Sequence, residues 1–263
     1  MTRRLTTIAL RLVLAAALAP IGLVAVHAQS GSVKGSSALR ADLRGETVAA
    51  EVRHMADWAV HSGDHRKLPF IVVDKVNARA VAFDAHGRLI RSTPVLLGMG
   101  VGDTFAPGVV NMDMYETQPS QRITPAGRFF ADEGENTAGE RVLWVDYDNG
   151  IAIHKLSAKR TKQRRHERMR SPDPAQHRIT YGCINVPPAF YDQVVRPQFK
   201  RKGGIVYVLP DSTPLKAVFK SYDVNERAYA RLQTSALRAP TVPAAARFQA
   251  HNVRVTESLR IAP

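Results

Sequence analysis

The pattern of apolar and polar positions in the middle of the chain predicts a β-sheet. Short runs rich in Val, Ile, Leu and Phe alternate with turn residues between positions 69 and 210. We interpret the following runs as strands: 69–75, 78–84, 88–98, 127–134, 141–148, 150–156 and 204–210. The sequence AHGR (85–88) is typical of a hairpin turn. Segment 100–121 is rich in Gly, Pro and polar residues, which predicts a long loop of the kind that often borders a site.

Helical spacing occurs on both sides of this predicted sheet. Apolar residues between 39 and 61 recur every three to four positions, which predicts a helix ended by Ser62, Gly63 and Asp64. Segment 188–197 predicts a short helix, and 215–232 has an imperfect helical pattern. Together these elements predict a mainly β, β-rich α+β fold with a few short helices, preceded by an N-terminal helix.

The first 28 residues resemble an export signal. Two arginines near the start are followed by an apolar run from Ile8 to Val26, and Ala28 suits a signal peptidase that cuts before Gln29. An uncleaved anchor helix is the alternative, but Arg11 and Pro20 interrupt the run too early for a span of about 20 residues. We therefore expect a cleaved signal and a periplasmic protein.

The expected organisation has four parts. Residues 1–28 form the signal and 29–67 a flexible leader with the N-terminal helix. Residues 68–210 form the core domain. Residues 211–263 form a basic C-terminal extension that is partly helical and, after Ser235, rich in Ala, Pro and Arg and expected to be poorly ordered.

A strong positive charge narrows the classes of partner. The formal net charge is +14, and loss of the three arginines in the signal would leave +11. Such a chain is attracted to cell-wall polymers, lipid headgroups or nucleic acid. We expect no nucleic-acid partner, because zinc-finger spacing and an RNP-like aromatic motif are missing from the sequence and aromatic residues make up 7% of it.

The only cysteine, Cys183, lies in the sequence RITYGCINVP (178–187). In an exported protein a single cysteine is either a small buried hydrophobe or a nucleophile. A nucleophilic thiol needs a base, and His154, at the end of a predicted strand, is the candidate. Gly182 would let the backbone turn sharply, so that N–H groups face a developing oxyanion. These residues alone leave both interpretations open.

The stretch TYGCIN (180–185) resembles the signature of the L,D-transpeptidase catalytic domain, also called the YkuD domain. That family carries a strand-end histidine and then Ser or Thr, any residue, Gly, Cys, any residue, and Arg or Asn. The matching positions are His154, Thr180, Gly182, Cys183 and Asn185. The resemblance covers about 68–210 and includes the hairpin at 84–87, Leu97-Gly98, ITPAGRF (123–129), which would border the cleft, and the last predicted strand, GIVYVLP.

The sequence departs from the family pattern at three points. Tyr181 stands where the family often has His, and Lys155 where it often has Gly. The basic segment SAKRTKQRRHERMRS (157–171) lengthens the connection between His154 and Cys183. We expect this segment to be a solvated helix or loop, with a basic lid over the site as the alternative.

The resemblance implies a YkuD-like β-sandwich, with 68–210 as the catalytic domain of a peptidoglycan L,D-transpeptidase. Cys183 would attack the bond between the L-centre residue and the terminal D-alanine of a stem tetrapeptide, with His154 as base and then acid. The thioester would pass to an amine, giving a 3–3 cross-link or an anchored wall protein.

The resemblance also implies supporting roles at the site. The backbone of Tyr181 and Gly182 would form the turn that binds the oxyanion, and the carbonyl of Lys155 would orient His154. Thr180 and Asn185 would hold the turn. Arg178 is our candidate for binding a substrate carboxylate. We expect no metal and no cofactor, although His61 and His65 have a spacing that can bind zinc, and we expect covalent inhibition by carbapenems.

Other functions remain in competition with this one. Water as acceptor would make the chain an L,D-carboxypeptidase or hydrolase. A non-catalytic cell-wall-binding protein and a basic surface protein are alternatives of other classes.

Overall fold

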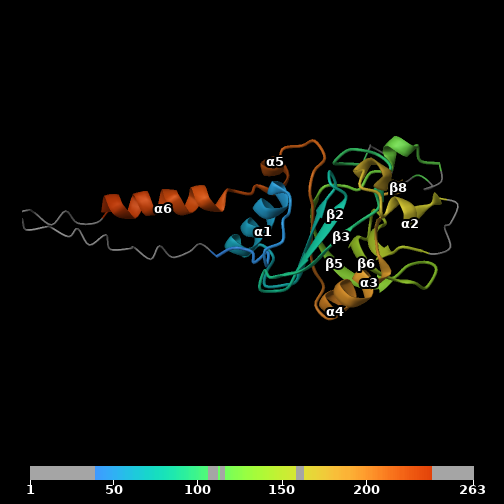
Figure 1. The fold of residues 1–263 in the computed structure, drawn as a ribbon, viewed down its shortest axis with the longest axis horizontal. Coiled ribbons are helices and arrows are strands. Elements are labelled where there is room, and N and C mark those ends of the chain that lie inside the picture. The colour runs from blue at the N-terminus through green and yellow to red at the C-terminus, as the bar shows by residue number, and fades with distance from the viewer. Residues whose placement is uncertain (1–38, 106–111, 113–115, 158–162, 239–263) are drawn as a thin grey trace, which may run out of the picture. The chain divides into compact units, whose positions relative to one another are not determined.

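The computed structural model describes the chain except for residues 1–38, 106–111, 113–115, 158–162 and 239–263 (Figure 1). The strands are β1 (Phe70–Asp74), β2 (Arg79–Phe83), β3 (Leu89–Pro94), β4 (Leu97–Gly98), β5 (Gly127–Glu135), β6 (Arg141–Asp146), β7 (Ile151–Lys155), β8 (Arg178–Thr180), β9 (Ile184–Val186) and β10 (Gly204–Val208). The helices are α1 (Ala50–Ser62), α2 (Arg165–Arg168), α3 (Pro188–Phe190), α4 (Arg196–Phe199), α5 (Leu215–Phe219) and α6 (Val224–Arg238). Two 3₁₀ turns, η2 (Pro119–Gln121) and η4 (Pro174–His177), and a π-helical segment, η5 (Tyr191–Val195), complete the described elements.

Eight strands form one mixed sheet in the order β3-β2-β1-β10-β5-β6-β7-β9. Most neighbours are antiparallel, but β10 pairs parallel to β1 and β9 pairs parallel to β7. Strands β4 and β8 form a separate parallel pair. Leu96 lies between β3 and β4 and forms a backbone bridge with Asn185 of β9. The expected mainly β fold with a few short helices is confirmed.

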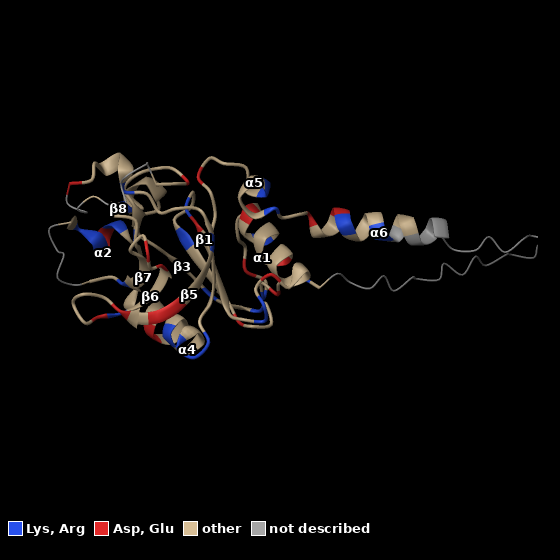
Figure 2. Ribbon diagram, turned by 180° about the vertical axis from the view of Figure 1, so that it is seen from behind, with Lys and Arg blue, Asp and Glu red and all other residues tan. Residues whose placement is uncertain are grey.

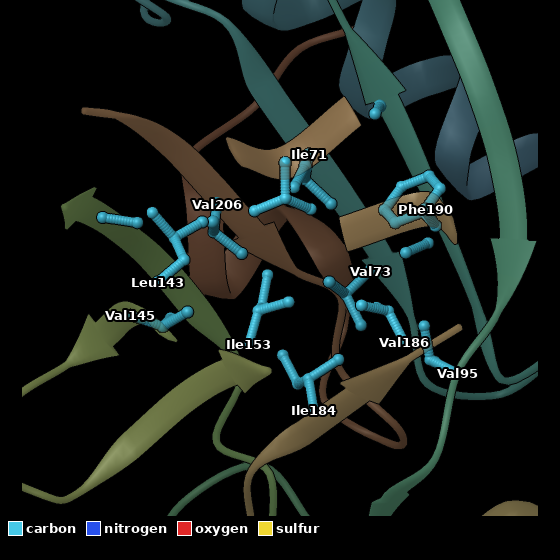
Figure 3. Packing of buried hydrophobic residues seen from close by; sticks show 14 of the residues in the cluster. Ile71, Val73, Val95, Leu143, Val145, Ile153, Ile184, Val186, Phe190 and Val206 are labelled. Carbon is cyan, nitrogen blue, oxygen red and sulfur yellow. The ribbon is translucent and has the colours of Figure 1, made fainter. Parts of the chain in front are cut away.

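Side chains on the two faces of the sheet fill two hydrophobic cores. Along β1, Ile71 and Val73 point into the first core, while Phe70 and Val72 point into the second, as the two-residue period of a strand requires. The first core is lined from both halves of the sheet and by the α3–η5–α4 segment, as a sandwich requires (Figure 3). Helix α1 packs over the second core (Figure 1). These cores fix the ends of β7 and β9, where the candidate site lies.

The predicted N-terminal helix begins later than expected. Residues 39–49 are not helical, and α1 starts at Ala50. Arg44 and Gly45 have positive φ angles of 50° and 80°, and Asp42 pairs with the backbone at Arg88 instead of forming a helical turn. The prediction over 39–61 was therefore wrong in its first part and correct from 50 onward. Similarly, predicted strand 88–98 is divided into β3 and β4, and predicted helix 215–232 into α5 and α6.

The signal and the leader up to residue 38 lie outside the described residues, as do residues 239–263 of the C-terminal extension. Within the part of the chain that the structure describes, none of the helices combines the length and apolar character needed to span a membrane.

A buried ionic cluster joins the ends of several strands. The ammonium of Lys75, directly after β1, is fully buried and lies 2.9 Å from Asp103 and 3.3 Å from Asp211. Arg178, the first residue of β8, pairs with Asp211 at 2.6 Å, so two cations balance two carboxylates. Lys75 also donates to the carbonyl of Thr124, at 3.0 Å.

The charge state of Asp103 couples this cluster to pH. Burial acts to raise its pKa, but hydrogen bonds from the backbone N–H groups of Asp211 and Thr213, together with Lys75, lower the pKa below its ordinary value. A carboxyl whose pKa is lowered by folding stabilises the fold above its unfolded pKa of about 3.9, and this contribution is lost as pH falls further. The cluster therefore stabilises the fold at neutral pH and weakens in acid.

We expect Lys75→Met to lower the free energy of unfolding by about 3–5 kcal/mol, because it leaves two buried carboxylates with one cation. Urea denaturation at neutral pH measures this loss. Lys202→Met, on the exposed turn between α4 and β10, removes the same charge and should change stability by less than about 0.5 kcal/mol. Equal stabilities of the two variants would contradict the assigned role of the cluster.

Candidate active site

The turn that carries Cys183 connects β8 to β9. Gly182 has φ = 130°, and a Cβ atom there would lie 2.8 Å from the carbonyl oxygen of Ile123 and 2.8 Å from Cδ1 of Ile151. The position therefore requires glycine on both conformational and steric grounds. Thr180 Oγ1 accepts from the N–H of Gly182 at 3.2 Å and donates to the carbonyl of Cys183 at 2.6 Å. The hydroxyl of Thr180 thus bridges two backbone groups of the turn.

A second threonine fixes this turn to the neighbouring loop. Thr124 Oγ1 donates to the carbonyl of Gly182 at 2.8 Å and accepts from the N–H of Gly98 at 2.9 Å. Thr124 is fully buried. The segment that follows Arg122 is therefore attached directly to the backbone beside Cys183.

The parallel pairing of β7 with β9 brings His154 beside Asn185, its register partner. Register partners of adjacent parallel strands share a face, so Asn185 lies on the same face as His154, and Cys183 lies in the turn that leads directly into β9. Cys183 is partly exposed, and its Sγ lies 3.3 Å from the carbonyl oxygen of Gly150, just before β7. The structure therefore places the thiol just before β9, the strand that pairs with β7, at whose end His154 lies.

The ring of His154 is held on two sides. Its Nδ1 lies 3.2 Å from the carbonyl oxygen of Lys155, and its Nε2 lies 2.9 Å from Nδ2 of Asn185. An amide N–H can only donate to a nitrogen lone pair, so the neutral ring has its hydrogen on Nδ1, where it donates to Lys155. Nε2 is then the basic nitrogen. The backbone of Lys155 occupies the orienting position we expected, while its ammonium pairs with Asp192 at 3.0 Å.

The amide orientation of Asn185 is in turn set by Arg165. Asn185 is fully buried, and its Oδ1 accepts from Nη1 of Arg165 at 2.6 Å, which leaves Nδ2 directed at His154. Arg165 is itself buried, and its Nε donates to Oε1 of Gln163 at 2.6 Å. A hydrogen-bonded chain thus runs from α2 through Asn185 to the imidazole.

Arg165 belongs to the basic segment that we expected to be solvated, and for this residue the expectation was wrong. The neighbouring Arg164 is exposed and pairs with Glu167, as a solvated residue would. Figure 2 shows how charged residues of both signs gather on α2. A run of basic residues carries no pattern that distinguishes the buried arginine from its exposed neighbours. Residues 158–162 of the segment lie outside the described residues.

We expect Arg165→Met to leave the buried Oδ1 of Asn185 without this donor, at a cost of about 1–3 kcal/mol in stability. The amide would also lose its fixed orientation toward His154. At a pH and temperature at which the variant is folded, Cys183 should then react with iodoacetamide at a rate different from that of the wild type. Arg164→Met is the matched control and should change neither property. Identical behaviour of the two variants would show that Arg165 does not position His154.

Cys183 opens into a cleft of about 330 Å³. The backbone at Gly150 and the side chains of Tyr147, Tyr181 and Arg122 also line it. Tyr181 has the guanidinium carbon of Arg122 4.0 Å above its ring centroid. Tyr147 is 72% exposed at the rim, and its ring packs edge-on against Trp144. Tyr181 therefore lines the cleft beside Cys183.

Two expected roles at the site are not supported by the structure. The N–H of Gly182 donates to Thr180 and so does not face the cleft as an oxyanion donor in this arrangement. Arg178, expected to bind a substrate carboxylate, is instead held by Asp211 in the buried ionic cluster and is 12% exposed. The partner of Gly182 is only two residues away in the sequence, whereas the partner of Arg178 is 33 residues away.

Sequence reasoning missed Arg122, Tyr147 and Arg165. Arg122 could have been found, because it directly precedes the ITPAG stretch that we expected to border the cleft. Tyr147 lies at the end of a predicted strand, where nothing in the pattern distinguishes a rim residue from a turn residue.

The two histidines with zinc-like spacing have other contacts. His61 Nδ1 lies 2.8 Å from the hydroxyl of Tyr222, and His65 Nδ1 lies 2.9 Å from the carbonyl oxygen of Ala59. Over the described ranges of the chain, no group of three or more His, Cys, Asp or Glu side chains is arranged to hold a metal ion.

Comparison with known proteins gives only distant likenesses. No family model matches the sequence, and no curated protein matches it. The chain is similar to an L,D-transpeptidase of Xylanimonas cellulosilytica, with 16% identity over 54% of this chain and 60% of that chain and a TM-score of 0.35. It is also similar to the catalytic domain of an E. faecium L,D-transpeptidase, with 18% identity over 55% and 99% of the two chains and a TM-score of 0.34. A third structure, the LD transpeptidase LdtMt1 in complex with imipenem, has 15% identity, 54% and 58% coverage and a TM-score of 0.31. Likenesses at this level carry no argument about chemistry, which rests on the site itself.

Proposed function

We propose that this chain is a peptidoglycan L,D-transpeptidase that uses Cys183 as its nucleophile. One observation carries the proposal: a partly exposed thiol opens into a cleft just before β9, and on the paired strand β7 the imidazole of His154 is held with Nε2 as its basic nitrogen. A nucleophilic thiol needs such a base, whereas a structural cysteine is usually buried. The resemblance of residues 180–185 to the L,D-transpeptidase signature supplies the substrate class.

The proposed reaction begins when His154 Nε2 takes the thiol proton. This transfer requires Nε2 to give up the hydrogen bond from Asn185, while the Nδ1–H bond to the carbonyl of Lys155 stabilises the resulting imidazolium. The sulfur of Cys183 attacks the carbonyl carbon of the L-centre residue in a stem tetrapeptide. Thr180 accepts from the N–H of Gly182, and the backbone of the turn at 181–183 would bind the oxyanion.

The second half of the reaction releases one amino acid and transfers the acyl group. His154 returns its proton to the amine of the terminal D-alanine as the C–N bond breaks, and a thioester remains on Cys183. The amine of a second stem peptide then attacks the thioester and gives a proton to His154, the C–S bond breaks, and Cys183 is released as the thiol with a 3–3 cross-link formed; a lysine of a wall protein would become anchored in the same way. We place this activity in the periplasm, on the basis of the resemblance of residues 1–28 to an export signal, and expect carbapenems to acylate the same thiol.

The acceptor is tested by the products formed from a disaccharide-tetrapeptide. A transpeptidase releases D-alanine and gives a cross-linked dimer, which liquid chromatography with mass spectrometry identifies. Tripeptide monomers without dimers would assign the chain as an L,D-carboxypeptidase on the same scaffold. Binding to peptidoglycan without release of D-alanine would contradict the enzymatic function and favour a wall-binding protein.

A further inference from the structure

Arg122 lines the cleft of Cys183, and several contacts hold its guanidinium in place. Its guanidinium lies over the ring of Tyr181, two residues before Cys183, and all three residues line the same cleft. Its Nε donates to the carbonyl of Thr117 at 3.1 Å and lies 3.3 Å from the hydroxyl of the same residue; Nη2 donates to that carbonyl at 2.8 Å, and Nη1 lies 3.5 Å from Sδ of Met99. These contacts hold the plane of the guanidinium in place.

The guanidinium retains binding capacity after these contacts. Arginine has five N–H groups, and the contacts above use three of them, which leaves one N–H on Nη1 and one on Nη2. Among the described residues, no carboxylate forms an ion pair with Arg122; Asp148 also lines the cleft, without such a contact. A planar cation with two N–H groups remaining is suited to a carboxylate.

The backbone places Arg122 at a fixed position relative to the thiol. Arg122 is followed by Ile123, whose carbonyl oxygen would lie 2.8 Å from a Cβ on Gly182, and by Thr124, which donates to the carbonyl of Gly182 at 2.8 Å. The N–H of Gly100 also donates to the carbonyl of Arg122 at 3.0 Å. Arg122 and the turn of Cys183 therefore form one hydrogen-bonded unit.

We propose that Arg122, stacked on Tyr181, forms a subsite for a carboxylate on the compound that reacts with Cys183. The ligand class is an acyl compound with a free carboxylate near the carbonyl that the sulfur attacks. If the chain has the proposed function, on which this step rests, the carboxylate is that of the terminal D-amino acid of the stem peptide. The subsite would then explain why the enzyme acts at the end of a stem peptide and not at an internal peptide bond.

A pair of small alkylating reagents tests the subsite without relying on the proposed function. Iodoacetate and iodoacetamide both form an S–C bond with Cys183 and release iodide, but only iodoacetate carries a carboxylate. The ratio of the two rate constants therefore reports on carboxylate recognition near the thiol and cancels changes in thiol reactivity. Intact-protein mass spectrometry follows both reactions on the only cysteine in the chain.

We expect Arg122→Gln to lower the iodoacetate-to-iodoacetamide ratio by about tenfold, because one charge-assisted contact is lost. Arg122→Lys, which keeps the charge without the planar fork, should give an intermediate ratio. Arg201→Gln, on the exposed turn between α4 and β10, removes the same net charge and should leave the ratio unchanged. An unchanged ratio in Arg122→Gln, or an equal fall in Arg201→Gln, would overturn the proposal.

A competition measurement on the unaltered protein covers the case in which Arg122→Gln does not fold. Acetate and D-alanine should slow alkylation by iodoacetate in a saturable manner, relative to chloride at equal ionic strength, and absence of this protection would overturn the subsite.

The carboxylate subsite and the transpeptidase function can be rejected independently of each other. A carboxylate-dependent ratio without turnover of a tetrapeptide would reject the transpeptidase and keep the subsite, whereas turnover with a ratio independent of Arg122 would reject only the subsite.

Discussion

Cys183→Ala is expected to abolish release of D-alanine from a stem tetrapeptide, with a fall of about 10⁴-fold or more in turnover. The proposed reaction passes through a thioester, and the chain contains no second cysteine that could form one. Serine at this position should be inactive as well, because its hydroxyl is far less acidic than a thiol and His154 is arranged to activate sulfur. Release of D-alanine, measured by a coupled assay or by mass spectrometry, gives the turnover.

The interpretation of this variant depends on an intact fold. Cys183 is partly exposed, and the hydrogen bond of its thiol to Gly150 is weak, so alanine should change the free energy of unfolding by less than about 1 kcal/mol. The turn itself is held by backbone groups and threonines, which the substitution leaves in place. Turnover by a folded Cys183→Ala protein near the wild-type level would rule out the proposed nucleophile.

His154→Gln should reduce turnover by about 10²–10⁴-fold, the usual contribution of a positioned general base and acid. Glutamine keeps a polar group next to Asn185 but cannot take up the thiol proton or return it to the leaving amine. The rate at which iodoacetamide alkylates Cys183 at neutral pH should fall in parallel, because fewer thiols are present as thiolate. Both rates are measured on the same preparations.

His86→Gln is the matched control for this substitution. His86 is exposed in the hairpin turn between β2 and β3, where its backbone N–H donates to Asp84, and its replacement should leave both rates unchanged. If His154→Gln and His86→Gln had the same turnover, the assignment of His154 as the base would be wrong, even if Cys183 were still required.

The sequence predicted the sheet well where strands are long and their alternation is complete. All of the predicted strands overlap an observed strand, and two residues of the resemblance, His154 and Asn185, are register partners on β7 and β9. β8 and β9, which flank the cysteine, have three residues each, too few for a period of two to be recognised. The glycine and threonine of the turn were found because their roles are local.

Roles that depend on distant partners could not be predicted. Arg178 was assigned to substrate because it lies close to the Cys183 motif, yet in the fold it pairs with Asp211, which also pairs with Lys75. Arg165 was assigned to a solvated segment because its neighbours are basic, yet it is buried against Asn185. In both cases the guanidinium donates to a buried side chain from another part of the chain, Asp211 for Arg178 and Asn185 for Arg165.

The central claim, that Cys183 is an acylated nucleophile, is tested most directly by intact-protein mass spectrometry. The wild-type protein and Cys183→Ala would be incubated separately with a tetrapeptide muropeptide and with a carbapenem. We expect a covalent adduct on the wild type alone, located at Cys183 by peptide mapping, together with loss of the terminal D-alanine from the muropeptide. A folded wild-type protein with a reduced thiol that forms no adduct with either compound would contradict it.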